Sequence, residues 1–394
     1  MRVLLVASRY PVPAWRGNQV RTVEWLDALA EHELTLVCPR PAREASLSPG
    51  VRSLFDPTAK PERGIGLLRA LFSSRPLQEG LYDTNRSRSL VVEALRDWQP
   101  DVVVVQMVRC GWAAELVDQI SPSTPVIFDA IDSMGLHFER AAATSRFPAS
   151  ALFAAESRRC HRRELELASS ATLCVAVARR DLERLRVPGG RQRVIPVAGR
   201  EVPSAEPASE PVVIVTGNLG YRPTVRGVEW FADRVWPRVL DSVPAARWLL
   251  VGARPARAVQ RLDNRPGIEV HSDVPDLAPF LARARLAAAP MSSGSGVPMK
   301  VLEAMAAGLP VVVQPWAADG LVEQARGAVA VSTEDDEWAR TITSLLTDDS
   351  RAEDLAHKGR EAWRRFYHPD VIAQQVRDVV EDAVSQSGSG VRST

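Results

Sequence analysis

The run Pro290-Met-Ser-Ser-Gly-Ser-Gly-Val-Pro-Met-Lys-Val-Leu-Glu-Ala-Met-Ala-Ala-Gly-Leu-Pro310 places a glycine-rich loop between a short apolar segment and a helical pattern. We expect a buried strand that ends at Met291 and a helix that begins at Pro298, because proline is favoured at the first helical position. The free N–H groups of that first turn and the positive end of the helix dipole attract an anion. Gly294 and Gly296 let an anion approach the backbone closely. The stretch therefore predicts phosphate binding at the start of a helix.

Two polar side chains follow on the same helix. Lys300 and Glu303 are three residues apart, so they lie on one helix face near the loop. Together they add a cation and a carboxylate, which accepts hydrogen bonds from sugar hydroxyls, to the phosphate-binding loop. This combination suits a nucleotide diphosphate that carries a sugar.

Composition sets wide limits on the class of protein. The chain has 394 residues, 45% of them hydrophobic and 25% charged, which is typical of globular domains and allows two of them. Its net charge of +1 gives no reason to expect nucleic acid as a partner. The four cysteines show no CxxC spacing, which favours a reducing, cytoplasmic setting. No apolar run approaches the roughly 20 residues of a membrane span, but a short basic and apolar patch would suffice for peripheral membrane contact.

The first half alternates strand-like runs with amphipathic segments such as Val20–Leu29. The predicted strands are Arg2–Ser8, Leu34–Pro39, Asp101–Gln106, Pro125–Ala130, Ala171–Val177 and Arg193–Val197. Several are apolar on both faces, as expected for parallel strands covered by helices. Residues 40–88 are less regular and read as a loop-rich insertion with short helices.

A Pro-, Ser- and Glu-rich linker, Gly199–Pro211, precedes a second alternating array. Its predicted strands are Val212–Thr216, Arg247–Gly252, Gly267–His271, Leu286–Met291, Leu309–Gln314 and Ala328–Val331. Two such arrays predict an α/β protein with two Rossmann-like doubly wound domains, at 1–203 and 204–368. A helix at 369–386, which can pack back on the first domain, and a disordered tail at 387–394 complete the chain. Because ligands bind beyond the carboxyl ends of parallel strands, we expect the domains to face each other across a ligand-binding cleft.

Three stretches carry a resemblance to a known family. The first is Ser8-Arg-Tyr-Pro-Val-Pro-Ala-Trp-Arg-Gly-Asn-Gln-Val-Arg21 after the first predicted strand. The second is Thr216-Gly-Asn-Leu-Gly-Tyr-Arg-Pro-Thr224 with Val228-Glu-Trp-Phe-Ala-Asp233 after it. The third is the run 290–310 with the stretch before it, Val274-Pro-Asp-Leu-Ala-Pro-Phe-Leu281. On these stretches the chain resembles the GT-B glycosyltransferases, and within them the bacterial sugar transferases of glycosyltransferase family 4, whose N-terminal glycine loop is similar to the first stretch. The resemblance spans most of the chain.

The resemblance implies an enzyme that moves a sugar from a nucleotide-diphosphate sugar to an acceptor, with retention, without a metal and with no other cofactor. We expect the acceptor to be a small molecule or a lipid-linked glycan. The family carries two glutamates separated by seven residues around the loop; Glu303 matches the second, which holds the ribose, but Ser295 stands in place of the first, which contacts the sugar. This departure leaves alternatives open: a pseudo-glycosyltransferase, a nucleotide-sugar epimerase, or an inactive nucleotide-binding partner subunit.

Candidate site residues follow from the loops and strand ends. Those expected to bind the donor are Gly17, Asn218, Val274, Ser295, Gly296, Val297, Met299, Lys300 and Glu303. Those expected to take part in catalysis are Asp129, Asp132, Arg222 and Lys300. Those expected to bind the acceptor are Asn18, Arg21, Gln106 and Arg109.

Several of these residues also have a simpler interpretation. Asp129 and Asp132 follow an apolar strand, where one of them could orient the acceptor or act as a base; Asp132 could equally cap a helix. Arg21 and Arg222 could lie on solvated helix faces. The Asp-Ala-Ile-Asp132 spacing is not that of a metal-binding Asp-x-Asp motif, and the sequence shows no cluster of metal ligands.

Overall fold

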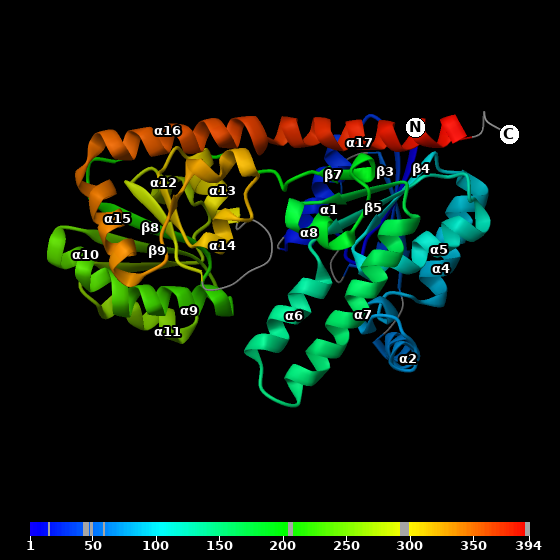
Figure 1. The fold of residues 1–394 in the computed structure, drawn as a ribbon, viewed down its shortest axis with the longest axis horizontal. Coiled ribbons are helices and arrows are strands. Elements are labelled where there is room, and N and C mark those ends of the chain that lie inside the picture. The colour runs from blue at the N-terminus through cyan, green and yellow to red at the C-terminus, as the bar shows by residue number, and fades with distance from the viewer. Residues whose placement is uncertain are drawn as a thin grey trace. The chain divides into compact units, whose positions relative to one another are not determined.

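The protein is described by a computed structural model, which covers residues 1–14, 16–41, 47, 50–57, 60–203, 208–291 and 299–390. The chain forms two compact units, one of Met1–Val197 with Ile372–Thr394 and the other of Ala198–Val371. Each unit holds a sheet flanked by helices (Figure 1). The division falls at 197/198, just before the expected linker and ahead of the boundary that we placed after residue 203.

The sheet of the first unit has seven parallel strands in the order β3-β2-β1-β4-β5-β6-β7. They are β1 (Arg2–Val6), β2 (Glu33–Pro39), β3 (Val51–Asp56), β4 (Val102–Gln106), β5 (Val126–Ile131), β6 (Leu173–Ala176) and β7 (Gln192–Val194). All five residues of β4 are buried, because helices cover both faces of the parallel sheet. Strand β3, which the sequence pattern did not predict, lies at the sheet edge and is mostly half-buried.

Helices connect these strands. They are α1 (Gly17–Ala28), α2 (Lys60–Leu71), α3 (Leu77–Gly80), α4 (Asn85–Glu93), α5 (Gly111–Ile120), α6 (Met134–Thr144), α7 (Ala149–Ser170) and α8 (Arg179–Leu185). The region that we expected to be loop-rich, 40–88, therefore contains β3, α2, α3 and the start of α4. Among the described residues, no helix is long and apolar enough to cross a membrane.

The last helix, α17 (Pro369–Gly390), belongs to the first unit from Ile372 onward. It buries Ile372, Val376, Val379, Val380 and Ala383. Arg193 Nη2 on β7 donates to Asp382 Oδ2 at 2.6 Å, and Arg377 Nη1 donates to the carbonyl of Ala28 at 3.2 Å. The helix continues to Gly390, beyond the end that we expected at 386, and residues 391–394 lie outside the described part of the chain.

The second unit has six parallel strands in the order β10-β9-β8-β11-β12-β13. They are β8 (Val212–Asn218), β9 (Arg247–Ala253), β10 (Ile268–Ser272), β11 (Leu286–Ala289), β12 (Val311–Val313) and β13 (Ala330–Val331). The connecting helices include α9 (Arg222–Trp230), α10 (Trp236–Ser242), α11 (Arg257–Gln260), α12 (Ala278–Leu281), α13 (Met299–Ala306), α14 (Pro315–Ala318), α15 (Asp335–Thr347) and α16 (Asp349–Phe366).

Two features make this second unit compact. Phe231, Trp248 and Trp338 are fully buried in its core, and the rings of Phe231 and Trp248 meet edge to face with centroids 4.6 Å apart. Gly227 on α9 lies directly on the end of β11, because a Cβ there would stand 1.5 Å from the carbonyl oxygen of Pro290. Helix α9 is therefore held against the strand that leads into the glycine-rich loop.

Candidate functional site

The second unit gathers polar residues at the carboxyl end of β8. Its strand order reverses between β8 and β11, which is where open α/β sheets bind ligands. Gly217 and Asn218 end β8, and α13 begins at Met299 beside them. This arrangement brings Lys300 of α13 against the backbone of Gly217.

Lys300 is the most unusual group of this site. A Cβ at Gly217 would lie 3.2 Å from Lys300 Cε and 3.3 Å from Nζ, and the φ of +121° at Gly217 is one that side chains disfavour. The ammonium is buried and has no hydrogen-bond partner within the described ranges. Burial lowers the pKa of Lys300 from 10.5 to about 8, and the negative charge of Glu303 opposes that shift. A buried ammonium without a partner among the described residues has the chemistry to bind an anion, and that role stays a prediction.

Glu303 stands one turn further along α13 and is partly buried. Burial raises the pKa of its carboxyl, while Arg200 and Lys300 lower it. Such a carboxylate, set in a partly dry environment near a cation, accepts hydrogen bonds strongly. It has the chemistry that the sequence predicted for a ribose contact, and that role stays a prediction.

The other predicted donor residues differ in what they contact. Asn218 is exposed, and its Oδ1 accepts from the N–H of Gly220 at 3.0 Å, so it holds the turn after β8. Arg222 is the exposed first residue of α9. Val274 and Met299 are partly buried and pack against the apolar core beneath the sheet. Ser295, Gly296 and Val297 lie outside the described residues, as do Gly294 and Pro298.

In the first unit, three predicted residues meet in one buried network. Arg21 on α1 donates from Nε to Asp129 Oδ2 at 3.0 Å and from Nη1 to the carbonyl of Pro196 at 3.1 Å. Gln106 donates from Nε2 to the same Asp129 oxygen at 3.4 Å and accepts from Thr22 Oγ1 at 2.7 Å. The strand order β1-β4-β5 places the ends of β4 and β5 next to α1, which brings these distant residues together.

This network corrects one of our interpretations. The side chains of Arg21 and Asp129 have 0% exposure and Gln106 has 2%, so Arg21 does not lie on a solvated helix face. The three residues join α1 to the sheet. Their predicted roles in acceptor binding and catalysis stay predictions.

The remaining predicted residues of the first unit lie nearer the surface. Gly17 is the exposed first residue of α1 and has open space around it; Asn18 is half-buried. Arg109 donates to Gln78 Oε1 and lies near the sulfur atoms of Met107 and Met134, at 3.9 and 3.8 Å. Burial lowers the pKa of Arg109. No ion pair within the described ranges involves it, so it is a cation without a carboxylate partner.

Two buried carboxyls near the start of α6, those of Glu164 and Asp181, were not predicted from the sequence. Ser133, not Asp132, caps α6 by accepting from the N–H of Leu136 at 3.2 Å. Glu164 of α7 accepts from the N–H of Met134 at 2.6 Å, and burial raises its pKa to about 7. Burial, followed by the charge of Asp132, raises the pKa of Asp181 to about 6. Neither carboxyl belongs to a sequence motif, so only the fold reveals them.

Metal ligands do not gather in the part of the chain that the structure describes, where no three His, Cys, Asp or Glu side chains are placed to share an ion. The four cysteines, all buried, are unpaired.

Comparisons with known proteins show what the chain is similar to. A family model described as glycosyl transferase 4-like domain matches residues 17–198, and one described as glycosyl transferases group 1 matches residues 210–348. None of the curated proteins matches the sequence.

Solved structures match over nearly the whole chain. Sucrose-phosphate synthase from Thermosynechococcus elongatus has a TM-score of 0.71 at 16% identity and covers 98% of this chain and 100% of its own. HepE from Anabaena, in complex with UDP and glucose, has a TM-score of 0.64 at 14% sequence identity, and the match covers 97% of this chain and 100% of HepE. Trehalose 6-phosphate synthase from Burkholderia multivorans has a TM-score of 0.64 at 11% sequence identity, and the match covers 99% of this chain and 98% of the synthase. At these identities the likeness shows the fold alone.

Proposed function

The chain belongs to the GT-B glycosyltransferases, and from this premise we propose that it transfers a sugar from a nucleotide-diphosphate sugar bound at the β8–α13 site of the second unit. The observation that carries the proposal is the buried ammonium of Lys300, which stands against Gly217 without a partner among the described residues. A bound diphosphate supplies a negatively charged partner for this ammonium. Glu303, one turn away on the same helix, accepts hydrogen bonds from the ribose hydroxyls.

Catalysis in this proposal rests on stabilising the leaving group. When the bond between the sugar and the diphosphate breaks, negative charge grows on the diphosphate oxygens. Lys300, in a site with little water, stabilises that charge more in the transition state than in the ground state. Arg222, exposed at the start of α9, is a second cation that stabilises the negative charge on the diphosphate. The proposal needs neither a metal ion nor a protein nucleophile, and the anomeric configuration is retained.

The acceptor belongs to the first unit in this proposal. Gly17, Asn18 and Arg109 follow β1 and β4 at the carboxyl edge of the sheet, while Arg21, Gln106 and Asp129 hold α1 in position beneath them. Asp132, near that edge, is the candidate base for the acceptor hydroxyl. We propose a small molecule or a lipid-linked glycan as the acceptor, in the reducing setting that four unpaired cysteines favour.

The direct test is the release of nucleotide from UDP-, GDP-, ADP-, TDP- and CDP-linked sugars. UDP-glucose comes first in this series, because HepE is known in complex with it. We expect one donor to release its nucleotide, and the release to rise when the matching acceptor is added. The anomeric configuration of the product, read by NMR, tests retention. An enzyme that releases no nucleotide from any donor with any acceptor contradicts the proposal.

Ser295 favours a second candidate, because it stands where the family has the glutamate that contacts the donor sugar. In that candidate the protein binds the nucleotide sugar and epimerises it, joins non-sugar cyclitols, or does no chemistry. An epimerase changes the donor sugar without an acceptor, which NMR of the recovered donor detects. Binding without turnover across a broad acceptor panel favours an inactive partner subunit.

The affinity for the nucleotide is expected to fall as the pH rises through about 8. Lys300 has a pKa of about 8 in the free protein, and a bound diphosphate raises that pKa because it favours the charged form. Binding above this pH therefore takes up a proton, and the affinity falls by up to about tenfold per pH unit. Calorimetric titration with the preferred nucleoside diphosphate from about pH 7 to about pH 9 measures the effect. If the affinity of Lys300→Met falls with pH as steeply as that of the parent protein, another group causes the pH dependence.

Replacing Glu303 by glutamine is expected to weaken donor binding about 10- to 100-fold, because a hydrogen bond to a charged group contributes about 1.5–3 kcal/mol. The measurement is the KM for the donor sugar, with Glu361→Gln on the exposed face of α16 as the control. A KM that does not change removes Glu303 from the site.

A further inference from the structure

Helix α2 turns apolar side chains outward. Ile65, Leu68 and Leu71 are 52%, 56% and 45% exposed, and Phe72, just after the helix, is 91% exposed. Their spacing of three or four residues places Ile65, Leu68 and Phe72 on one face. Single exposed apolar residues are common on proteins, but a row of them on one helix face marks an interaction surface.

The opposite face of α2 is tightly packed. A Cβ at Gly66 would stand 2.0 Å from the carbonyl oxygen of Gly80 in α3, so the two helices meet backbone to backbone. Ala70, on the same side, is buried. Because α2 is held in this way, its apolar face stays directed outward.

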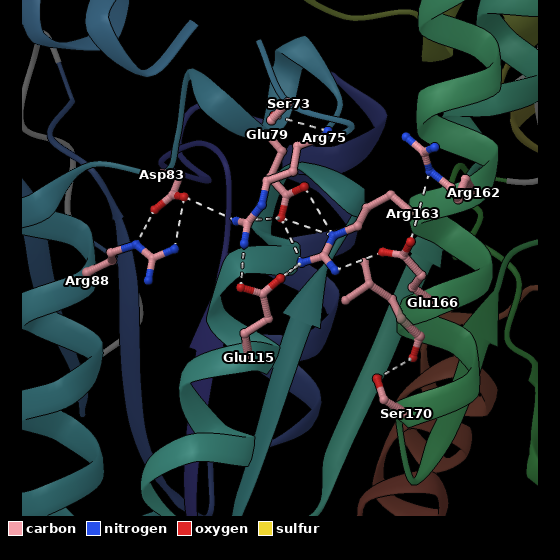
Figure 2. A network of polar contacts seen from close by, with 11 residues as sticks. Ser73, Arg75, Glu79, Asp83, Arg88, Glu115, Arg162, Arg163, Glu166 and Ser170 are labelled. Atoms are coloured by element: carbon pink, nitrogen blue, oxygen red, sulfur yellow. Dashed lines mark hydrogen bonds and ion pairs between the residues drawn. The ribbon is translucent and has the colours of Figure 1, made fainter. Parts of the chain in front are cut away.

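A network of ion pairs anchors the segment that follows α2, as Figure 2 shows. Arg163 of α7 donates from Nη2 to Glu79 of α3 at 3.0 Å and to Glu115 of α5 at 2.6 Å. Arg75 reaches the other oxygen of Glu115 at 2.7 Å. Glu79 is fully buried, so the network is partly desolvated and hence firmer than a surface pair. The α2–α3 segment is thus fastened to α5 and α7.

Helix α7 extends the exposed apolar surface. Arg159 donates from Nη2 to the carbonyl of Leu71 at 3.3 Å, which places α7 beside the end of α2. Leu152 is 54% exposed and lies seven residues before Arg159, about 10 Å along the same helix face. Phe147, which precedes α7, is 84% exposed. We call this the α2–α7 surface; it consists of Ile65, Leu68, Leu71, Phe72, Phe147, Leu152 and the arginines Arg69, Arg146, Arg158, Arg159 and Arg162.

The charge on this surface is mainly positive. Residues 64–78 and 141–162 contain six arginines, five of them in the α2–α7 surface, and one acidic residue, Glu156, which is 4% exposed. Glu166, one turn beyond on α7, lies 4.0 Å from Arg162 and offsets part of this charge. An arginine-rich surface repels a second copy of itself, because a two-fold dimer would place the same arginines of both copies face to face.

We propose that the α2–α7 surface docks the protein on a bilayer that contains anionic lipids. Phe72, Phe147 and the leucines insert among the headgroups and upper acyl chains, while the arginines bind the lipid phosphates. Arginine suits this role because its planar fork pairs with phosphate. The docking does not require glycosyl transfer, so the two proposals can be tested independently of each other.

The test is cosedimentation of the full chain with vesicles of phosphatidylcholine alone and of phosphatidylcholine mixed with phosphatidylglycerol. We expect binding to the mixed vesicles only. The double variant Leu68→Ser/Phe72→Ser should lower the partition coefficient about tenfold or more, because each substitution removes most of the free energy gained when an apolar side chain leaves water. Arg69→Gln/Arg158→Gln should weaken binding several-fold and lower its sensitivity to salt.

The matched controls lie on the second unit. Val331→Ser replaces an exposed apolar residue and Arg257→Gln an exposed arginine, and neither should alter sedimentation. Circular dichroism of each variant shows that it folds. Equal binding to both kinds of vesicle, no binding to either, or unchanged binding by both α2–α7 variants overturns the proposal. So does a dimer in light scattering that Phe72→Ser dissociates, because the surface then serves a second copy of the chain.

Discussion

Lys300→Met is expected to lower kcat/KM for the donor about 100- to 1000-fold, which is the usual effect of removing one group that stabilises a leaving group's charge. The structure gives the reason. The ammonium stands against Gly217, is buried, and has no other partner among the described residues. Methionine fills a similar volume without the charge. Steady-state kinetics with the preferred donor measure the loss, which should appear in kcat as well as in KM.

The same substitution is expected to stabilise the free protein. The pKa of Lys300 is about 8 in the folded state against 10.5 as its ordinary value, so the charged form is disfavoured by folding. This cost is fully present below about pH 8, amounts to at most about 3 kcal/mol, and disappears as the pH rises toward 10.5. Lys300→Met should therefore have the higher Tm at neutral pH, with a difference that shrinks at alkaline pH.

The control for both effects is Lys358→Met, which removes an exposed lysine paired with Asp354 on α16. It should change neither kcat/KM nor Tm appreciably. A variant Lys300→Met that is active, or one that loses activity because it is less stable than the parent, contradicts the assignment of Lys300 as a buried anion receptor.

Asp129→Ala is expected to destabilise the first unit by about 3–5 kcal/mol, the usual cost of leaving a buried charge without its partner. Arg21 and Asp129 both have 0% side-chain exposure, and Arg21 Nε lies 3.0 Å from Asp129 Oδ2. Removing the carboxylate leaves the guanidinium buried with the carbonyl of Pro196 and the more distant Glu24 as its partners. Gln106 loses a hydrogen bond as well.

Urea unfolding followed by tryptophan fluorescence measures this loss. Arg21→Met/Asp129→Ala should recover part of the stability, because it removes the unpaired charge. Glu93→Ala, which breaks an exposed pair with Arg52 at 3.8 Å, should cost less than about 1 kcal/mol. A double variant that is as unstable as the sum of the two single variants shows that the buried pair is not coupled.

Much of the fold was predictable because its strands carry their signal locally. Each expected strand is present. Runs such as 102–106 are apolar on both faces, which is the pattern of a parallel strand covered by helices on both sides, so the sequence alone identifies them. Strand β3 escaped prediction because it lies at the sheet edge and includes Arg52 and Ser53, which break the apolar run. Helix α2 was not located either, because its outward face is apolar where a surface helix is usually polar.

The site was predictable where a motif is contiguous and unpredictable where it is assembled in space. Lys300 and Glu303 follow a glycine-rich loop within one short stretch, so their proximity was evident. Arg21 and Asp129 are 108 residues apart, and an arginine in a helix is normally exposed. Only the strand order reveals that they form a buried pair. Glu164 and Asp181 were missed for the same reason.

The central claim, that the β8–α13 site binds the diphosphate of a nucleotide sugar, is tested most directly by calorimetric titration with UDP, GDP, ADP, TDP and CDP. We predict that at least one of them binds the parent protein, that Lys300→Met weakens this binding at least about tenfold, and that Arg257→Gln does not change it. Failure of all five to bind, or equal binding by the parent and Lys300→Met, would contradict the account.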